Sequence, residues 1–230
     1  MVRTRFHAAR NGFAFRNCLS RETLTLPGGR RVELIGRHGG MAYAALDYFQ
    51  AACPVPASPA ESPWLIGYLR QRLHQSFATP SAVRFPLWAM AEDASLARAV
   101  AGYEIPRLCR SLDAGYPAVV GLIRARSLDE LATGCRQAVA YGYDVDQGSG
   151  ALRFFLYDDD DPSTEVTLTV SASAESIRAT NRAIPWRGLF LHDYRFRKPP
   201  TGPAPADAEA APAPPAGQVR ELAAFRRAVA

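Results

Sequence analysis

The residues with the clearest chemical potential lie where a glycine-rich turn leads into an amphipathic helix. His38 stands in this turn, between Gly36 and Gly40, and apolar residues follow at three- and four-residue spacing as far as Phe49. A side chain at such a point lies beside unpaired backbone N–H groups and the positive end of the helix dipole. With Arg37 as its neighbour, His38 is placed to favour an anion such as a carboxylate, a phosphate or the C-terminus of a peptide.

A second group of polar residues lies farther along the chain. One predicted strand begins with Cys135, Arg136 and Gln137. A run of four aspartates, which begins at Asp158, directly follows another predicted strand. Neighbouring residues of a strand face opposite sides, so Cys135 and Arg136 should point in opposite directions. A guanidinium keeps its proton at any working pH, and Arg136 therefore cannot act as a general base.

The elements that must position these residues are helices first and strands afterwards. A hairpin over 22–35 precedes the helices, which are predicted at 41–49, 62–77, 93–101 and 104–114, and the strands are predicted at 118–123, 135–143, 152–157, 166–170 and 189–194. Helices followed by antiparallel strands indicate the α+β class.

The composition divides the chain of 230 residues into a domain and an appendage. Residues 1–196 are long enough to bury a full core. The predicted linker is 197–217; within it, from residue 199 on, proline and alanine fill 14 of 19 positions, a composition that cannot build a core. Residues 218–230 have helical spacing and several arginines, which predicts a short basic helix.

Charge and hydropathy exclude several classes of partner. The net charge is +5, but the arginines are scattered without an aromatic-interleaved stripe, which argues against nucleic-acid binding. No apolar run approaches the ~20 residues that span a bilayer, and the N-terminus has no apolar signal region. We therefore expect a cytoplasmic protein without a membrane segment.

No metal or cofactor is expected from the sequence. The four cysteines are far apart and lack the C-x-x-C spacing of a zinc site. The acidic turn at Asp144, Asp146 and Gly148 has its glycine too early for a calcium-binding EF-hand loop, and no glutamate closes it. A solvated turn is the better interpretation.

Three segments resemble a bacterial papain-like family related to the bacteriocin-processing, double-glycine peptidases. The segment 36–49 is similar to the family's nucleophile turn and helix, 134–144 to its histidine-bearing strand, and 155–162 to the strand end with the residue that orients the histidine. The resemblance covers roughly 6–195. It implies a papain-like fold, in which N-terminal helices carrying the nucleophile-position turn pack on a C-terminal antiparallel sheet.

Transferred position by position, the resemblance implies a site without its chemistry. The family's cysteine is replaced by His38 and its histidine by Arg136, whereas Asp158 keeps the expected type. Val32 stands where a glutamine helps to build the oxyanion hole, and Asn17 is the nearest amide that could substitute. A cysteine peptidase needs a thiolate and an imidazole within hydrogen-bond reach. These replacements predict a catalytically inactive homologue, a pseudoenzyme.

Several functions remain open for such a protein. The altered cleft could bind a peptide, a protein or an anion through Arg37, His38, Gly39, Asn17, Arg136, Gln137 and Asp158. Alternatively, Arg136 pairs with Asp158 and fills the cleft as a scaffold. A working hydrolase or transferase would need Cys135 as nucleophile and His38 as base. In a structural interaction protein, the helix at 218–230 would recruit the partner.

Overall fold

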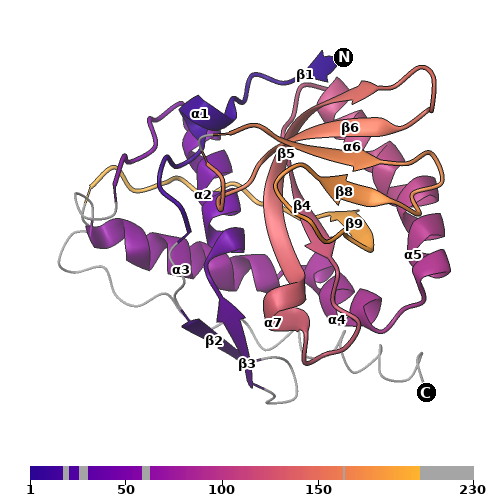
Figure 1. Cartoon of the computed structure of the whole chain (residues 1–230). Helices are drawn as coiled ribbons and strands as arrows, with labels where there is room; N and C mark the ends of the chain where they lie inside the picture. Colours follow the sequence, from indigo (N-terminus) through magenta and orange to yellow (C-terminus); the bar gives the residue numbers. More distant parts are fainter. Residues whose placement is uncertain (18–20, 26–30, 59–62, 163, 203–230) are drawn as a thin grey trace.

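The computed structural model describes residues 1–17, 21–25, 31–58, 63–162 and 164–202, which combine helices with a curled antiparallel sheet (Figure 1). The sheet has the strand order β8-β7-β6-β5-β4-β9, and β1 pairs with the part of β5 that extends past Ala118, the first residue of β4. Its strands are β1 (Val2–Arg3), β4 (Ala118–Ile123), β5 (Cys135–Val145), β6 (Leu152–Tyr157), β7 (Val166–Val170), β8 (Ile177–Ala179) and β9 (Gly188–Leu191). The mixed helix and strand content fits the predicted α+β class.

Helices cover both faces of this sheet (Figure 1). One face carries α2 (His38–Gln50) and α3 (Pro63–Phe77); the other carries η2 (Val100–Glu104), a π-helical turn, and α6 (Ile105–Asp113), which follow α5 (Asp93–Ala99). The helices α2 and α3 approach closely because Gly40 has no side chain: a Cβ there would lie 2.1 Å from the carbonyl oxygen of Leu69.

Alternate side chains of the central strands divide the core into two clusters. Val119 of β4 and Val139 of β5 pack toward α2, whereas Val120 and Ala140 pack toward α6. All four are buried, as the alternation of a strand covered on both faces requires. A smaller third cluster lies where β4 ends and β5 begins; its buried members are Phe85, Ala89, Ile123, Ala125, Leu131 and Phe190.

Most of the predicted elements are confirmed. The hairpin consists of β2 (Arg21–Thr25) and β3 (Arg31–Ile35), and the helices α2 and α3 and the strands β4, β6 and β7 lie close to their predicted bounds. The last strand ends at Leu191, earlier than predicted. Four short helices were not predicted: α1 (Ala8–Asn11), η1 (Pro80–Val83), α4 (Arg84–Ala89) and α7 (Leu131–Gly134). The chain beyond residue 202, with the predicted helix at 218–230, lies outside the described residues.

The prediction of two separate helices between 93 and 114 is wrong. The chain is helical without a break from Asp93 to Asp113, and η2 joins the two α-helical parts. Pro106 gives a physical reason for the wider turn, because it has no N–H to donate and its ring would clash with the carbonyl of Gly102 in a regular α-helix.

Beyond β9 the chain crosses the helices α2 and α3. The hydroxyl of Tyr194 and the backbone N–H of Arg197 both donate to Asp47 Oδ1, at 2.8 and 2.9 Å. The hydroxyl of Tyr48 donates to the carbonyl oxygen of Pro200 at 2.7 Å. The chain therefore remains attached to the domain through Pro200, a few residues past the predicted boundary at 196.

Candidate functional site

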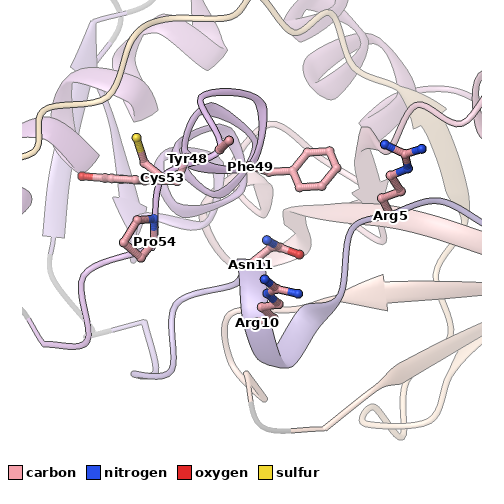
Figure 2. A pocket seen from close by; sticks show the side chains of 8 residues that line it. Arg5, Arg10, Asn11, Tyr48, Phe49, Cys53 and Pro54 are labelled. Carbon is pink, nitrogen blue, oxygen red and sulfur yellow. The ribbon is translucent and has the colours of Figure 1, made fainter.

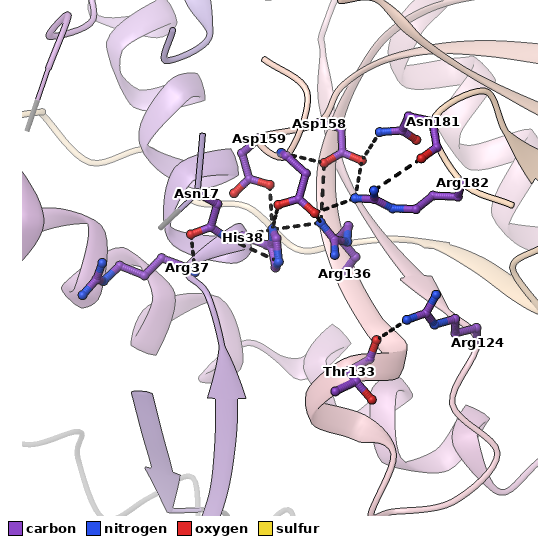
Figure 3. Close-up of polar contacts among 11 residues, drawn as sticks. Asn17, Arg37, His38, Arg124, Thr133, Arg136, Asp158, Asp159, Asn181 and Arg182 are labelled. Atoms are coloured by element: carbon purple, nitrogen blue, oxygen red, sulfur yellow. Dashed lines mark hydrogen bonds and ion pairs between the residues drawn. The ribbon is translucent and has the colours of Figure 1, made fainter. Parts of the chain in front are cut away.

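The three segments singled out in the sequence meet where the inner strand β5 begins and its neighbour β6 ends (Figure 3). His38 is the first residue of α2, Arg136 is the second residue of β5, and Asp159 follows the end of β6. Because β5 and β6 are antiparallel, the start of one lies beside the end of the other. The Nδ1 atom of His38 lies 2.6 Å from Asp159 Oδ1 and 3.4 Å from Arg136 Nη1.

Asn17 completes the surroundings of His38. Its Nδ2 atom lies 2.9 Å from Nδ1 and 3.2 Å from Nε2 of the imidazole, and its Oδ1 accepts the backbone N–H of Arg37 at 2.9 Å. Gly36 makes this approach possible, since it has a positive φ of 84° and a Cβ there would lie 2.4 Å from Asn17 Nδ2. Asn17, the amide named in the sequence analysis, is therefore in contact with His38.

The guanidinium of Arg136 is held by carboxylates. Its Nη1 contacts Asp160 Oδ2 directly and lies 3.7 Å from Asp158 Oδ1. Arg182 makes a parallel pair, with Nη2 at 2.6 Å from Asp160 Oδ2 and 3.6 Å from Asp158 Oδ2. The side chain of Asn181 donates to Asp158 Oδ2 at 3.0 Å. Burial favours the neutral form of Asp160, but Arg136, His38 and Arg182 outweigh it and lower the pKa of this carboxyl.

Asp159 is the buried member of the aspartate run, with 3% of its surface exposed. Burial raises the pKa of its carboxyl, and the nearby His38 opposes that shift. His38, Asp159 and Asp160 offer ligand atoms within 4.8 Å of one another, a geometry that could hold a cation. Arg136 contacts two of the three groups, however, so a cation would have to displace a guanidinium. The donor set therefore fits an ion-pair cluster better than a metal centre.

Cys135 lies away from this cluster, as the alternation of the strand predicts. It packs against the third hydrophobic cluster, where it lies opposite Ile123 of β4, and makes no hydrogen bond with His38. Burial raises the pKa of its thiol to about 12, so the thiol stays protonated at neutral pH. The pairing of Cys135 with His38 as nucleophile and base therefore has no geometric support.

Gln137 and Gly39 lie beneath the turn. Gln137 is 2% exposed, and a Cβ on Gly39 would lie 2.3 Å from its Oε1. Its Nε2 lies 3.3 Å from Nε2 of His192, whose Nδ1 is 3.0 Å from the hydroxyls of Tyr43 and Ser81. Both residues predicted as ligand contacts thus support the start of α2 from the core side.

Four residues of the cluster were missed by the sequence analysis: Asp159, Asp160, Asn181 and Arg182. The run of aspartates was visible, and Asp158 was named as the residue that orients the general base or pairs with Arg136. The structure has that pair, with Arg136 Nη1 at 3.7 Å from Asp158 Oδ1, whereas the contact of Asp159 with His38 was not predicted. No local pattern marks Asn181 or Arg182, because a turn after β8 brings them to the cluster.

Comparisons of the chain with protein-family models, with curated proteins and with solved structures return no match. Among the described residues, no helix has the length and apolar character needed to cross a membrane. The papain-like relationship thus remains an expectation from the sequence.

Proposed function

We propose that the chain is a papain-like domain without peptidase activity, which acts by binding a peptide or protein partner. One observation carries the proposal: the guanidinium of Arg136, the residue that the resemblance places at the general-base position, is held between Asp158 and Asp160. A permanently charged, paired guanidinium cannot accept a proton from a nucleophile. The neighbouring nucleophile position offers the imidazole of His38 in place of a thiol.

The pairing also favours the scaffold interpretation of the cleft over anion binding there. Both guanidiniums, of Arg136 and Arg182, already contact carboxylates, so an incoming anion would compete with Asp158 and Asp160. Ion pairs of this kind stabilise one arrangement of the surrounding segments when the attraction between the charges exceeds the free energy that their desolvation costs. The partner is therefore expected to bind elsewhere on the domain.

Alkylation by iodoacetamide near neutral pH, with mass mapping of each cysteine, tests the loss of chemistry. We expect slow labelling of Cys135 and Cys109, whose thiol pKa values burial raises to about 12 and about 11. His38→Ala should leave both rates unchanged. Rapid, selective labelling of Cys135 that is lost in His38→Ala would restore a catalytic pair and reject the proposal.

Selection from a peptide-display library tests the binding function. The native protein should retain peptides of related sequence, and heat-unfolded protein should not. Failure of the native protein to enrich any sequence, in a selection where a known peptide-binding domain succeeds, would contradict a peptide-binding role.

A second candidate function is favoured by one contact. The 2.6 Å contact between His38 Nδ1 and Asp159 Oδ1 resembles the pairing that orients an imidazole as a general base. A hydrolase of this kind would activate water at His38 Nε2. Turnover of activated esters that is abolished in His38→Gln and in Asp159→Asn would support it, whereas the absence of turnover leaves the binding function as the better explanation.

A further inference from the structure

We infer that a cavity between α1 and the end of α2 binds a carboxylate carried on an apolar group. The cavity has a volume of about 400 Å³. It is lined by Arg5, Arg10, Asn11, Tyr48, Phe49, Ala52, Cys53 and Pro54 (Figure 2). Its volume lies within the range of small-molecule sites in proteins. It is separate from the cluster around His38, none of whose members lines it.

The cavity has positive charge and no acidic residue in its lining. Arg5 and Arg10 are both exposed, and neither guanidinium has an ion-pair or hydrogen-bond partner among the described residues. Asn11 accepts the backbone N–H of His7 with its Oδ1, which leaves its Nδ2 as a further donor. Guanidinium groups bind carboxylates with two parallel hydrogen bonds and remain charged at any working pH. The lining therefore favours an anionic ligand.

The rest of the lining is apolar and fixed in place. Phe49 packs edge-on against the buried ring of Phe6, at 5.4 Å between centroids. Ala52 has a positive φ of 53°, which turns the chain at the end of α2, and the backbone N–H of Cys53 donates to the carbonyl oxygen of Tyr48 at 3.0 Å. A preformed apolar wall beside two unpaired cations suits a ligand with a carboxylate at one end and an aliphatic or aromatic arm.

Two sources could supply this chemistry: the C-terminus of a peptide with an apolar last residue, or a small organic acid. The inference rests on the proposed binding function and gives it a ligand class. The two can fail separately. Peptides enriched by the native protein that bind equally well with a free or an amidated C-terminus would reject the cavity alone and keep the binding function.

Calorimetric titration of the full-length protein tests the inference with three probes. These are acetyl-Ala-Leu-Phe with a free carboxylate, the same peptide as its C-terminal amide, and 3-phenylpropionate. At least one of the two carboxylates should bind, and the amide should bind about tenfold more weakly or not at all, because it loses a charge-assisted hydrogen bond. Tighter binding of the peptide acid indicates a peptide C-terminus, and equal or tighter binding of phenylpropionate indicates a small acid.

Arg5→Gln and Arg10→Gln should each weaken binding of the carboxylate about tenfold. Arg178→Gln is the matched control, since this exposed arginine of β8 also has no partner for its guanidinium among the described residues and does not line the cavity. Binding should also weaken as salt is added. The inference is overturned if no probe binds, if the amide binds as tightly as the acid, or if neither arginine variant differs from the control.

Discussion

His38 Nδ1 lies 2.6 Å from Asp159 Oδ1 across a separation of 121 residues, and this contact joins the start of α2 to the end of β6. The sequence indicated the neighbouring Asp158 as a partner of Arg136 and did not predict a contact between Asp159 and His38. Because Asp159 takes the contact with His38, Asp158 is left to pair with Arg136 and Arg182. The aspartate run thus contacts one imidazole and two guanidiniums, with neighbouring carboxylates directed to different partners.

Replacing Asp158 should destabilise the fold. Asp158 is 3% exposed, accepts the backbone N–H of Asp160 at 3.0 Å and pairs with both arginines. Asp158→Ala leaves both guanidiniums and the Asp160 N–H without this carboxylate. We expect the free energy of unfolding, measured in urea titrations, to fall by about 3 kcal/mol. Asp161 belongs to the same run, and its carboxylate has no partner among the residues that the structure describes. Asp161→Ala should therefore change the free energy of unfolding by less than about 0.5 kcal/mol. Equal stability of Asp158→Ala and the parent would show that the pairing contributes nothing.

Introducing the residues that the papain-like resemblance implies at positions 38 and 136 should create a reactive thiol. In the double variant His38→Cys with Arg136→His, the new thiol stands at the first residue of α2, where the helix terminus favours the thiolate. We expect iodoacetamide to label it about tenfold faster than Cys135 at neutral pH. The single variant His38→Cys separates the effect of the helix terminus from that of the imidazole. Labelling no faster than that of Cys135 would count against the papain-like assignment of position 38.

The stability of the protein should depend on pH through His192. This residue is 3% exposed, and burial lowers its pKa to about 4 from 6.5. Since the folded state disfavours the proton, the unfolded state binds more protons between these values, and stability is lost as the pH falls below about 6.5. Through this imidazole, the free energy of unfolding should fall by about 2 kcal/mol when the pH is lowered from 7 to 5.

Urea titrations of His192→Gln over this pH range should show a shallower loss of stability than those of the parent. His74→Gln is the control, since His74 is exposed near the end of α3. If the parent and His192→Gln lose stability in parallel, the buried imidazole is not the group that titrates.

Asp47 should hold the segment after β9 on the helices. It is fully buried and accepts hydrogen bonds from Tyr68, Tyr194 and the Arg197 backbone, and its Oδ2 lies 2.7 Å from Nε of Arg72. Asp47→Asn leaves the buried Arg72 without a counter-charge, and we expect the free energy of unfolding to fall by about 3 kcal/mol.

The same variant should expose the segment to protease. Trypsin should cleave native Asp47→Asn after Arg195 and Arg197 faster than it cleaves the parent. Asp113→Asn, which alters an exposed carboxylate that accepts the Tyr143 hydroxyl, is the control. Unchanged cleavage would show that other contacts hold the segment.

The sequence predicted the elements better than the details of the site. The apolar spacing after His38 and the continuous apolar run 118–123 determine their elements locally, and both are confirmed. The strand alternation predicted only that Cys135 and Arg136 face opposite sides, and it left open which of the two faces His38. The role of Arg182 depends on β8 and its following turn, which have no local signature. Pro106 was the missed signal for η2, because it stands where two predicted helices in fact join.

The central strand β5 is flanked by β4 and β1 on one edge and by β6 on the other, and its side chains enter both hydrophobic clusters. Separation of either helical layer would therefore expose one face of β5, the strand that also carries the side chains packed against the opposite layer. The two clusters should melt in a single cooperative transition, with the amides of β5 the last to exchange with solvent. The pocket at Arg5 and the cluster at His38 would then be lost together, at one temperature.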